Sequence, residues 1–216
     1  MKRFLVIVSS IIMFLLVVGC GSDKNNSATT SMPKKQEITM EQKKQATGEI
    51  LRILGAMPQN KDEVEKKIWY QPWGNKAYPA KNAIYWYAGN KDDHVWMRAF
   101  IVNFSTDMGW VFWDKIIFST TEKNWEYKIK NVFAGQSGGG KSTDIVRGGK
   151  YETLDIPIAE VIQGYKLLIN GNNPIIRLEG KERYYDYKLT KTDIEHLKTG
   201  IYLYEQLQVT DGLIIK

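Results

Sequence analysis

The sequence predicts a single-domain α+β fold with N-terminal helices, an antiparallel β meander, and a C-terminal β hairpin followed by a helix. Apolar residues recur at helical spacing near both ends of the folded part of the chain. Between these ends, aromatic and β-branched runs of strand length alternate with clusters of turn residues. No segment of about 20 to 50 residues repeats, which excludes solenoid and propeller architectures.

Two helices are expected at the start of the domain. Residues 40–57 place apolar side chains on one helical face and polar side chains opposite, and a proline follows. Asn60 and Glu63 have the spacing of a capping box, so a second short helix is predicted at 60–69. The positions expected to be buried are Ala46, Ile50, Ile53, Leu54 and Met57 in the first helix, and Val64 and Ile68 in the second.

The middle of the chain is expected to form four strands, at residues 83–87, 95–104, 110–119 and 125–133. Turn residues at 89–92, 106–109 and 121–124 separate them, and such short connections require antiparallel neighbours. The strand at 95–104 is apolar on both faces except for Arg98. It is therefore expected to be central, with helices on one side and more sheet or a partner on the other.

Further elements are expected toward the C-terminus: a strand at 151–156, a short helix that begins at Pro157, a hairpin of 174–178 with 183–189, and a last helix that begins at Thr190. Arg177 and Asp186 fall on adjacent strands of this hairpin, where they are expected to form a cross-strand ion pair. Asp193 lies three residues after Thr190, the spacing of a capping box. The buried face expected for the last helix comprises Ile194, Leu197, Ile201, Tyr204 and Leu207.

The N-terminus has the layout of a secretory signal, because Met1-Lys2-Arg3 is basic and residues 4–18 are almost all apolar. The sequence Val17-Val18-Gly19-Cys20 resembles the lipobox of bacterial lipoproteins, whose cysteine is diacylated and becomes the first residue of the mature chain. This resemblance implies cleavage before Cys20 and a diacylglycerol anchor on the outer side of the cytoplasmic membrane. An uncleaved membrane span is less consistent with the sequence, because the apolar segment 4–18 has fifteen residues and a helix needs about 20 to cross the hydrocarbon core.

The chain is accordingly expected to have three parts: a signal peptide at 1–19, a flexible tether at 20–40, and one extracytoplasmic domain at 41–216. The tether is small and polar and has little apolar surface to bury. Cys20 is the only cysteine in the sequence. Its lipidation leaves the domain without a disulfide, a cysteine nucleophile or a thiolate metal site.

The charge of the chain is mildly basic. Its formal net charge is +6, and loss of Lys2 and Arg3 with the signal leaves 28 basic and 24 acidic residues. No run of five or more basic residues occurs, so no nucleic-acid partner is expected. The small excess suits a protein near anionic lipid or wall polymer, although lysines that only keep the surface hydrated are the simpler explanation.

One sequence motif matches a nucleotide-binding pattern. Gly135, Gly140, Lys141 and Ser142 fit the P-loop pattern GxxxxGK[ST], in which backbone N–H groups, a lysine and a hydroxyl bind phosphates and magnesium. A P-loop needs a helix directly after the motif, and here Gly148-Gly149 would interrupt it. It also needs parallel βαβ units rather than a meander. We therefore interpret the motif as a glycine-rich hairpin loop, and expect no nucleotide and no cofactor.

The aromatic residues supply the best candidate for a binding site. All seven tryptophans lie between positions 69 and 125, and most are expected in the core of an aromatic-rich sheet. The loop-like segment 69–74 is the exception, because Trp69, Tyr70 and Trp73 stand there beside proline and glycine. Exposed flat rings stack on sugars and dominate many interfaces, so these three residues are the predicted ligand-binding patch.

Catalytic chemistry is weakly represented. His94 and His196 have no third ligand at metal-binding spacing and no nucleophile beside them, so no catalytic residue and no metal site are assigned. The predicted function is a non-catalytic, lipid-anchored binding or interaction module at the cell envelope, facing a cell-wall glycan or an envelope protein. The alternative is an envelope hydrolase that uses Asp or Glu carboxylates, which a pocket lined by two carboxylates would favour.

Overall fold

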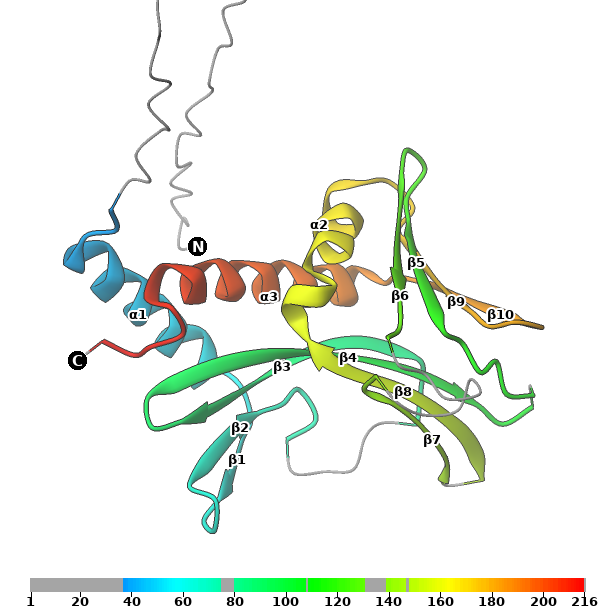
Figure 1. Cartoon of the computed structure of the whole chain (residues 1–216), viewed down its shortest axis with the longest axis horizontal. Coiled ribbons are helices and arrows are strands. Elements are labelled where there is room, and N and C mark those ends of the chain that lie inside the picture. The colour runs from blue at the N-terminus through cyan, green and yellow to red at the C-terminus, as the bar shows by residue number, and fades with distance from the viewer. Residues whose placement is uncertain (1–36, 75–79, 108, 131–138, 147, 216) are drawn as a thin grey trace, which may run out of the picture. The chain divides into compact units, whose positions relative to one another are not determined.

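The computed structural model describes residues 37–74, 80–107, 109–130, 139–146 and 148–215. Over these ranges the chain forms an α+β fold in one compact unit, Ile38–Lys216, which confirms the predicted fold class (Figure 1). In chain order the elements are α1 (Met40–Gly55), β1 (Gln59–Asp62), β2 (Lys67–Tyr70), β3 (Ala83–Lys91), β4 (His94–Ser105), β5 (Lys115–Ser119), β6 (Asn124–Lys128), β7 (Lys141–Val146), β8 (Gly149–Pro157), the 3-10 helix η1 (Ile158–Glu160), α2 (Ile162–Asn170), β9 (Ile175–Glu179), β10 (Tyr184–Lys188) and α3 (Lys191–Thr210).

The first and last helices begin at Met40 and after Thr190, as predicted, and the structure has a capping box at each start. At α1, the Thr39 hydroxyl accepts from the Gln42 N–H, and the Gln42 side chain accepts from the Thr39 N–H. Thr190 and Asp193 make the same reciprocal pair at the start of α3. Each box satisfies two backbone donors that the first turn of a helix leaves free, so these starts are fixed locally.

The larger sheet, sheet A, has six antiparallel strands in the order β1-β2-β3-β4-β8-β7. Asp92 and Asp93 alone connect β3 to β4, and both have positive φ (53° and 61°), as two-residue hairpin turns of type I′ require. The turn predicted at 89–92 was therefore placed too early. Gly89 lies within β3, where the missing side chain leaves room for the ring of Trp96.

The smaller sheet, sheet B, has the order β10-β9-β5-β6 and is also antiparallel. Its two hairpins lie where the sequence predicts them. Arg177 and Asp186 form the expected cross-strand pair, with Arg177 Nε 2.7 Å from Asp186 Oδ1 and Arg177 Nη2 2.8 Å from Asp186 Oδ2. This two-point contact fixes the register between β9 and β10.

The predicted second helix is wrong, because residues 59–70 form the β1–β2 hairpin. Asp62 Oδ1 accepts from the N–H groups of Val64 (3.0 Å) and Glu65 (2.9 Å), which favours a turn over a helix. Val64, expected to be buried, is 91% exposed at the hairpin tip. Pairing of β2 with β3, which local spacing does not report, decides the strand conformation.

The predicted meander is also corrected at its second link, between the strands expected at 95–104 and 110–119. β4 pairs with β3 and β8, whereas β5 belongs to sheet B, so the turn expected at 106–109 does not join neighbouring strands. Residue 108 of that segment lies outside the described residues. The strands expected at 110–119 and 125–133 correspond to β5 and β6, which are shorter than predicted. β7, which no sequence pattern predicted, adds an edge strand to sheet A.

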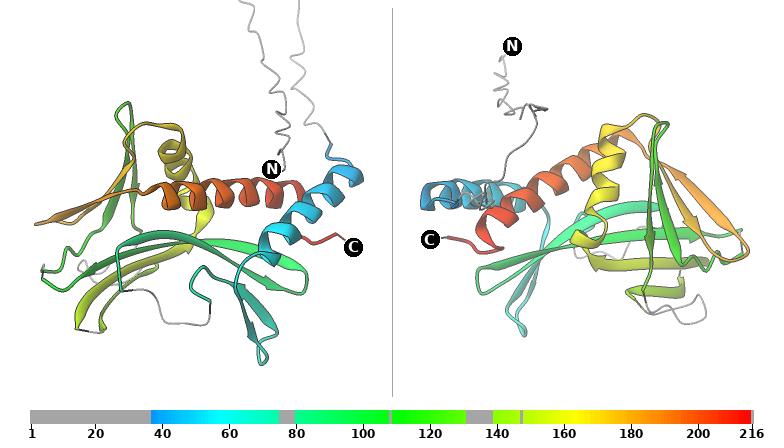
Figure 2. Two further views of the ribbon diagram at one scale, coloured as in Figure 1. Left: turned by 180° about the vertical axis from the view of Figure 1, so that it is seen from behind. Right: turned by 45° about the horizontal axis from the view of Figure 1, so that its top comes forward.

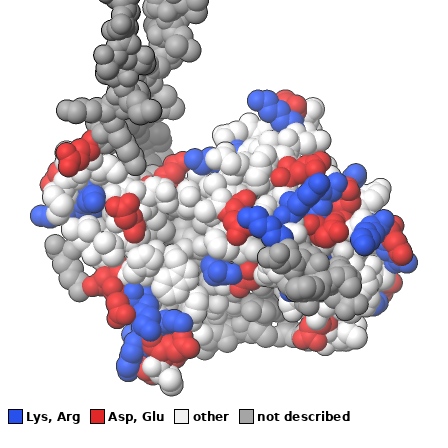
Figure 3. All heavy atoms as spheres, in the orientation of Figure 1, with Lys and Arg blue, Asp and Glu red and all other residues white. Residues whose placement is uncertain are grey.

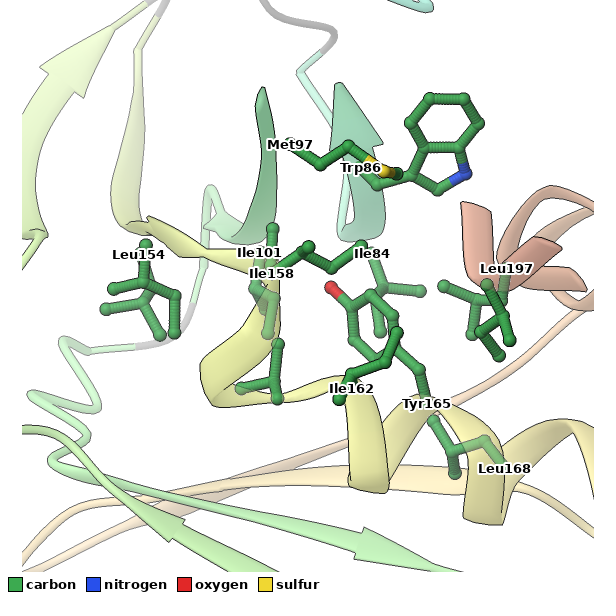
Figure 4. Close-up of a cluster of buried hydrophobic side chains, with 14 of the residues drawn as sticks. Ile84, Trp86, Met97, Ile101, Leu154, Ile158, Ile162, Tyr165, Leu168 and Leu197 are labelled. Atoms are coloured by element: carbon green, nitrogen blue, oxygen red, sulfur yellow. The ribbon is translucent and has the colours of Figure 1, made fainter. Parts of the chain in front are cut away.

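The main core lies between one face of sheet A and the helices. Figures 1 and 2 show all three α-helices on this side, which we call the inner face. Figure 4 shows side chains from β3, β4 and β8 meeting those of η1, α2 and α3. The labelled members are Ile84, Trp86, Met97, Ile101, Leu154, Ile158, Ile162, Tyr165, Leu168 and Leu197, and burial of such apolar surface is the dominant stabilising contribution.

Candidate ligand-binding surface

The segment 69–74 comprises the end of β2 and the turn after it, and its aromatic rings lie on both faces of sheet A. Trp69 and Tyr70 are consecutive strand residues, so their side chains point to opposite faces. Tyr70 is 7% exposed and belongs to the main core, whereas Trp69 is half-buried on the outer face. Trp73 follows in a turn closed by Gly74 N–H donating to Gln71 O, and it lies on the outer face too. The structure brings Trp69 and Trp73 together, but not Tyr70.

The outer face of sheet A carries a continuous cluster of rings. We call it the aromatic face and define it as Trp69, Trp73, Tyr85, Tyr87, Trp96 and Phe100. Tyr87 lies between the two tryptophans, with its ring centroid 5.9 Å from that of Trp69 and 5.9 Å from that of Trp73. Trp73 also contacts Phe100 at 5.3 Å. Because β2, β3, β4 and the turn at 71–74 all contribute rings, strand pairing holds this surface in place.

The strand register explains how these rings are positioned. Trp69 on β2 lies opposite Gly89 on β3, which lies opposite Trp96 on β4. A Cβ atom at Gly89 would lie 2.4 Å from the Trp96 ring and 2.9 Å from the Trp69 ring, both closer than van der Waals contact. Gly89 therefore provides the space in which the two indoles meet edge to face, with centroids 5.7 Å apart.

A polar group borders the aromatic face in the neighbouring rows of the sheet. Arg98 Nε donates to Asp155 Oδ1 at 2.5 Å, and the Tyr87 hydroxyl donates to Asp155 Oδ2 at 2.7 Å. Arg98 Nη2 also donates to the Asp155 backbone oxygen at 2.8 Å. The side chains of Arg98 and Asp155 are 30% and 37% exposed, so solvent and ligands reach them.

The protonation state of this group follows from its contacts. Burial, and then the hydrogen bond to Asp155, raise the pKa of Tyr87 well above its usual range, so the phenol keeps its proton and remains a donor. Arg98 has five N–H donors, and the two contacts to Asp155 leave others for a ligand. The surface thus offers flat apolar rings beside a planar cation and a fixed carboxylate, a combination suited to stacking and hydrogen bonding.

No family model, curated protein or solved structure matches the chain.

The residues of the P-loop pattern that the structure describes do not have the loop-and-helix conformation of a nucleotide-binding site. Gly135 lies outside the described residues, and Gly140 precedes a strand: Lys141 and Ser142 begin β7, which pairs antiparallel with β8. The Lys141 side chain is 0% exposed. Its ammonium group donates to the Trp113 backbone oxygen at 2.5 Å, so it points into the protein.

Lys141 is part of a buried network that joins sheet A to the segment directly before β5. Its Nζ atom lies 3.6 Å from Glu152 Oε1, and burial lowers the pKa of Lys141 to about 8. Glu152 also accepts from the N–H groups of Val111 (2.9 Å) and Phe112 (2.6 Å). Phe112 has a positive φ of 49°, an uncommon conformation that these bonds hold. The network therefore fixes the crossover from β4 to β5.

Three hollows in the described part of the surface were compared as possible catalytic pockets. They have volumes of about 520, 650 and 340 Å³. His196 lines the first, Glu122 the second, and His94 with Asp211 the third, and none of the three has two carboxylates in its lining. Among the described residues, no group of three His, Cys, Asp or Glu is placed to hold a metal ion. These hollows do not favour the hydrolase alternative.

The charged surface is mixed. On the face drawn in Figure 3, basic and acidic side chains lie next to one another, and neither sign covers a large continuous area. The described residues include ion pairs such as Lys115 with Glu179 (2.6 Å) and Lys166 with Glu205 (2.7 Å). The face drawn in Figure 3 does not favour a polyanionic ligand.

Strand alternation placed Trp96, Phe100 and Arg98 on one face of their strand, but sequence reasoning missed Tyr87 and Asp155 as their neighbours. Arg98 did give a signal, as the single charge in a strand that is otherwise apolar on both faces. Its partner Asp155 lies 57 positions later and becomes a neighbour only through the pairing of β4 with β8. Cys20 lies outside the described residues. Within the described ranges, no helix combines the length and the apolar character needed to cross a membrane.

Proposed function

We propose that the protein is a lipid-anchored, extracytoplasmic binding module that holds a cell-wall glycan on its aromatic face. The observation that carries this proposal is the arrangement of half-buried indoles beside Arg98 and Asp155 on one face of sheet A. A sugar ring presents an apolar C–H face and a polar hydroxyl edge. The rings of Trp69 and Trp73 can stack on the former, while Arg98 and Asp155 can bind the latter.

The polar group supports binding. Both side-chain oxygens of Asp155 already accept hydrogen bonds, from Arg98 and from Tyr87. A carboxylate held in this way is a fixed acceptor, oriented to bind a ligand hydroxyl.

The anchor is supported by the sequence of the N-terminus. Cys20 follows an apolar segment of secretory type and ends a lipobox-like tetrapeptide. Between Cys20 and α1, which begins at Met40, the chain is small and polar. A flexible chain of this length has a root-mean-square reach of roughly 20 to 25 Å, which keeps the domain close to the membrane and to a wall polymer outside it.

Binding can be tested by retention of the soluble chain, residues 21–216, on purified cell-wall glycan. Trp69→Ala and Trp73→Ala should each reduce retention about fivefold or more, because stacking on an aromatic ring contributes roughly 1 to 3 kcal/mol. Trp125→Ala is the matched control, since Trp125 is a half-buried tryptophan on β6, outside the aromatic face. Retention that is absent in the wild type, or equal in all variants, would contradict the glycan proposal. Capture of a membrane protein in place of glycan would also contradict it.

Anchoring can be tested separately in a bacterial host. The wild-type chain should appear in the membrane fraction with the mass of a diacylglycerol group on Cys20, and it should incorporate a labelled fatty acid. Cys20→Ser removes the thiol that accepts the lipid and should abolish both results. Labelling that persists in Cys20→Ser would refute the assignment of this residue.

A further inference from the structure

A second site lies on the other side of sheet A, between α1, α3 and the sheet edge. This hollow, which we call the α1–α3 hollow, has a volume of about 520 Å³. Small-molecule sites commonly have volumes of about 300 to 1,000 Å³. Segments far apart in the sequence supply its largely apolar walls, which comprise Ile53, Ala56, Met57, Pro58, Pro72 and Trp86.

The charged side chains in this lining have one sign. Arg52 and Lys198 line the hollow, and among the described residues its lining contains no Asp or Glu. Each cation makes a local ion pair, with Arg52 Nη2 2.8 Å from Glu49 Oε2 and Lys198 Nζ 3.0 Å from Glu195 Oε1. Exposed pairs of this kind contribute at most about 1 kcal/mol, so a ligand anion competes with them readily.

His196 and Trp86 form a rigid polar wall of the same hollow. Their rings stack with centroids 4.9 Å apart and an interplanar angle of 9°. Trp86 Nε1 donates to the His196 backbone oxygen at 2.6 Å, and His196 Nε2 lies 3.3 Å from both the N and the O of Trp86. These backbone atoms belong to a strand edge, because β2 pairs with β3 only from Ala88 onward. The imidazole therefore occupies the place of a neighbouring strand.

The fixed imidazole adds no charge to the hollow. Its Nε2 atom contacts the backbone at the edge of β3. Burial lowers the pKa of His196 below its ordinary value, so the ring is neutral at pH 7. The positive charge of the hollow thus comes from Arg52 and Lys198 alone.

We propose that the α1–α3 hollow binds a small amphipathic anion, a molecule with an apolar body and one carboxylate or phosphate group. The apolar walls bury the body, and burial contributes about 25 cal/mol per Å² of apolar surface. Arg52 and Lys198 hold the anionic group through charge-assisted hydrogen bonds. No residue of the aromatic face lines this hollow, so the proposal does not depend on glycan binding.

The test follows the indole N–H resonance of Trp86 by NMR in the chain 21–216, which contains the whole compact unit. Trp86→Phe identifies this resonance among the seven tryptophans. The probes share one apolar body and differ in the head: octanoate, octyl phosphate, octanol and octylammonium. Octanoate or octyl phosphate should shift the resonance saturably and bind at least about tenfold more tightly than octanol, and the tighter of the two identifies the preferred head group.

The variant Arg52→Gln/Lys198→Gln should weaken anion binding at least about tenfold, as expected when charge-assisted hydrogen bonds are removed. The control Lys181→Gln/Lys188→Gln removes the same charge from the β9–β10 hairpin, outside the hollow, and should bind like the wild type. The proposal is overturned if neither anion shifts the Trp86 resonance, if octanol binds as tightly as octanoate, or if the hollow variant binds undiminished. Should that variant fail to fold, the comparison of probes on the wild type still decides.

Discussion

Replacing Gly200 with alanine should destabilise the protein, although the same change stabilises most helices. Gly200 lies inside α3, where glycine costs about 1 kcal/mol relative to alanine. A Cβ atom at this position would lie 2.3 Å from Trp86 Cδ1 and 2.4 Å from Trp86 Nε1. Non-bonded carbon atoms normally stay about 3.5 to 4.0 Å apart, so the indole would have to move by more than an ångström.

The indole has little freedom to make that movement. Trp86 is 1% exposed, donates a 2.6 Å hydrogen bond to the His196 oxygen, and stacks on the His196 ring. Overpacking a core costs about 1 to 3 kcal/mol, and loss of the hydrogen bond adds about 1 kcal/mol. After subtraction of the gain of about 1 kcal/mol in helix propensity, Gly200→Ala should lower the free energy of unfolding by about 1 to 3 kcal/mol.

Urea denaturation of the chain 21–216, followed by circular dichroism, measures this change as a shift of the midpoint at constant slope. Gly48→Ala is the matched control, because Gly48 also lies inside a helix but a Cβ atom there meets nothing within 4 Å. It should stabilise the protein by about 0.5 to 1 kcal/mol. A Gly200→Ala variant as stable as the wild type would refute the argument, and so would a Gly48→Ala variant destabilised by the same amount.

Three further predictions concern the buried network and the aromatic face. Lys141→Met should lower the free energy of unfolding, measured in urea, by about 3 to 5 kcal/mol, because it leaves Glu152 buried without its cation. The double variant Lys141→Met/Glu152→Gln should recover much of this loss. A Lys141→Met variant as stable as the wild type would contradict the prediction. Burial lowers the pKa of Lys141 from 10.5 to about 8, so between pH 8 and 10.5 the unfolded chain binds more protons than the folded chain. Over this range the free energy of unfolding of the wild type should therefore rise with pH relative to that of the double variant. A difference that does not change with pH would contradict the prediction. Gly89→Ala should lower the free energy of unfolding by about 1 to 3 kcal/mol and also weaken glycan retention, because the added Cβ would displace the Trp96 ring. Unchanged retention would argue against the aromatic face as the binding surface.

The helices that were predicted well have their determinants within a few residues. Thr39 with Gln42 and Thr190 with Asp193 are close in sequence, and their capping boxes form without help from the rest of the chain. The hairpins of sheet B are similar, because short connections leave the chain few ways to pair. The segment 60–69 shows the limit of this reasoning. Its capping-box spacing was a local coincidence that pairing with β3 overrode.

The candidate site depended more strongly on distant contacts. Aromatic enrichment at 69–74 correctly pointed to Trp69 and Trp73 as neighbours on one surface, but strand alternation placed Tyr70 in the main core. The pairing of Arg98 with Asp155 requires the insertion of β8 beside β4. Trp86 and His196 are 110 positions apart, and only the packing of α3 against the edge of β3 brings them together.

The sequence alone determined the α+β class, the starts of the outer helices and the position of most strands, because each depends on spacing within a short segment. Tertiary structure decided the strand order, the assignment of β5 to a second sheet, and the face on which each ring lies. These depend on which distant segments pair, and a shift of one residue in register exchanges the two faces of a strand. Lys141 illustrates both kinds of information. The glycines after it spoke against a helix from the sequence alone, whereas only the fold places its ammonium group beside Glu152.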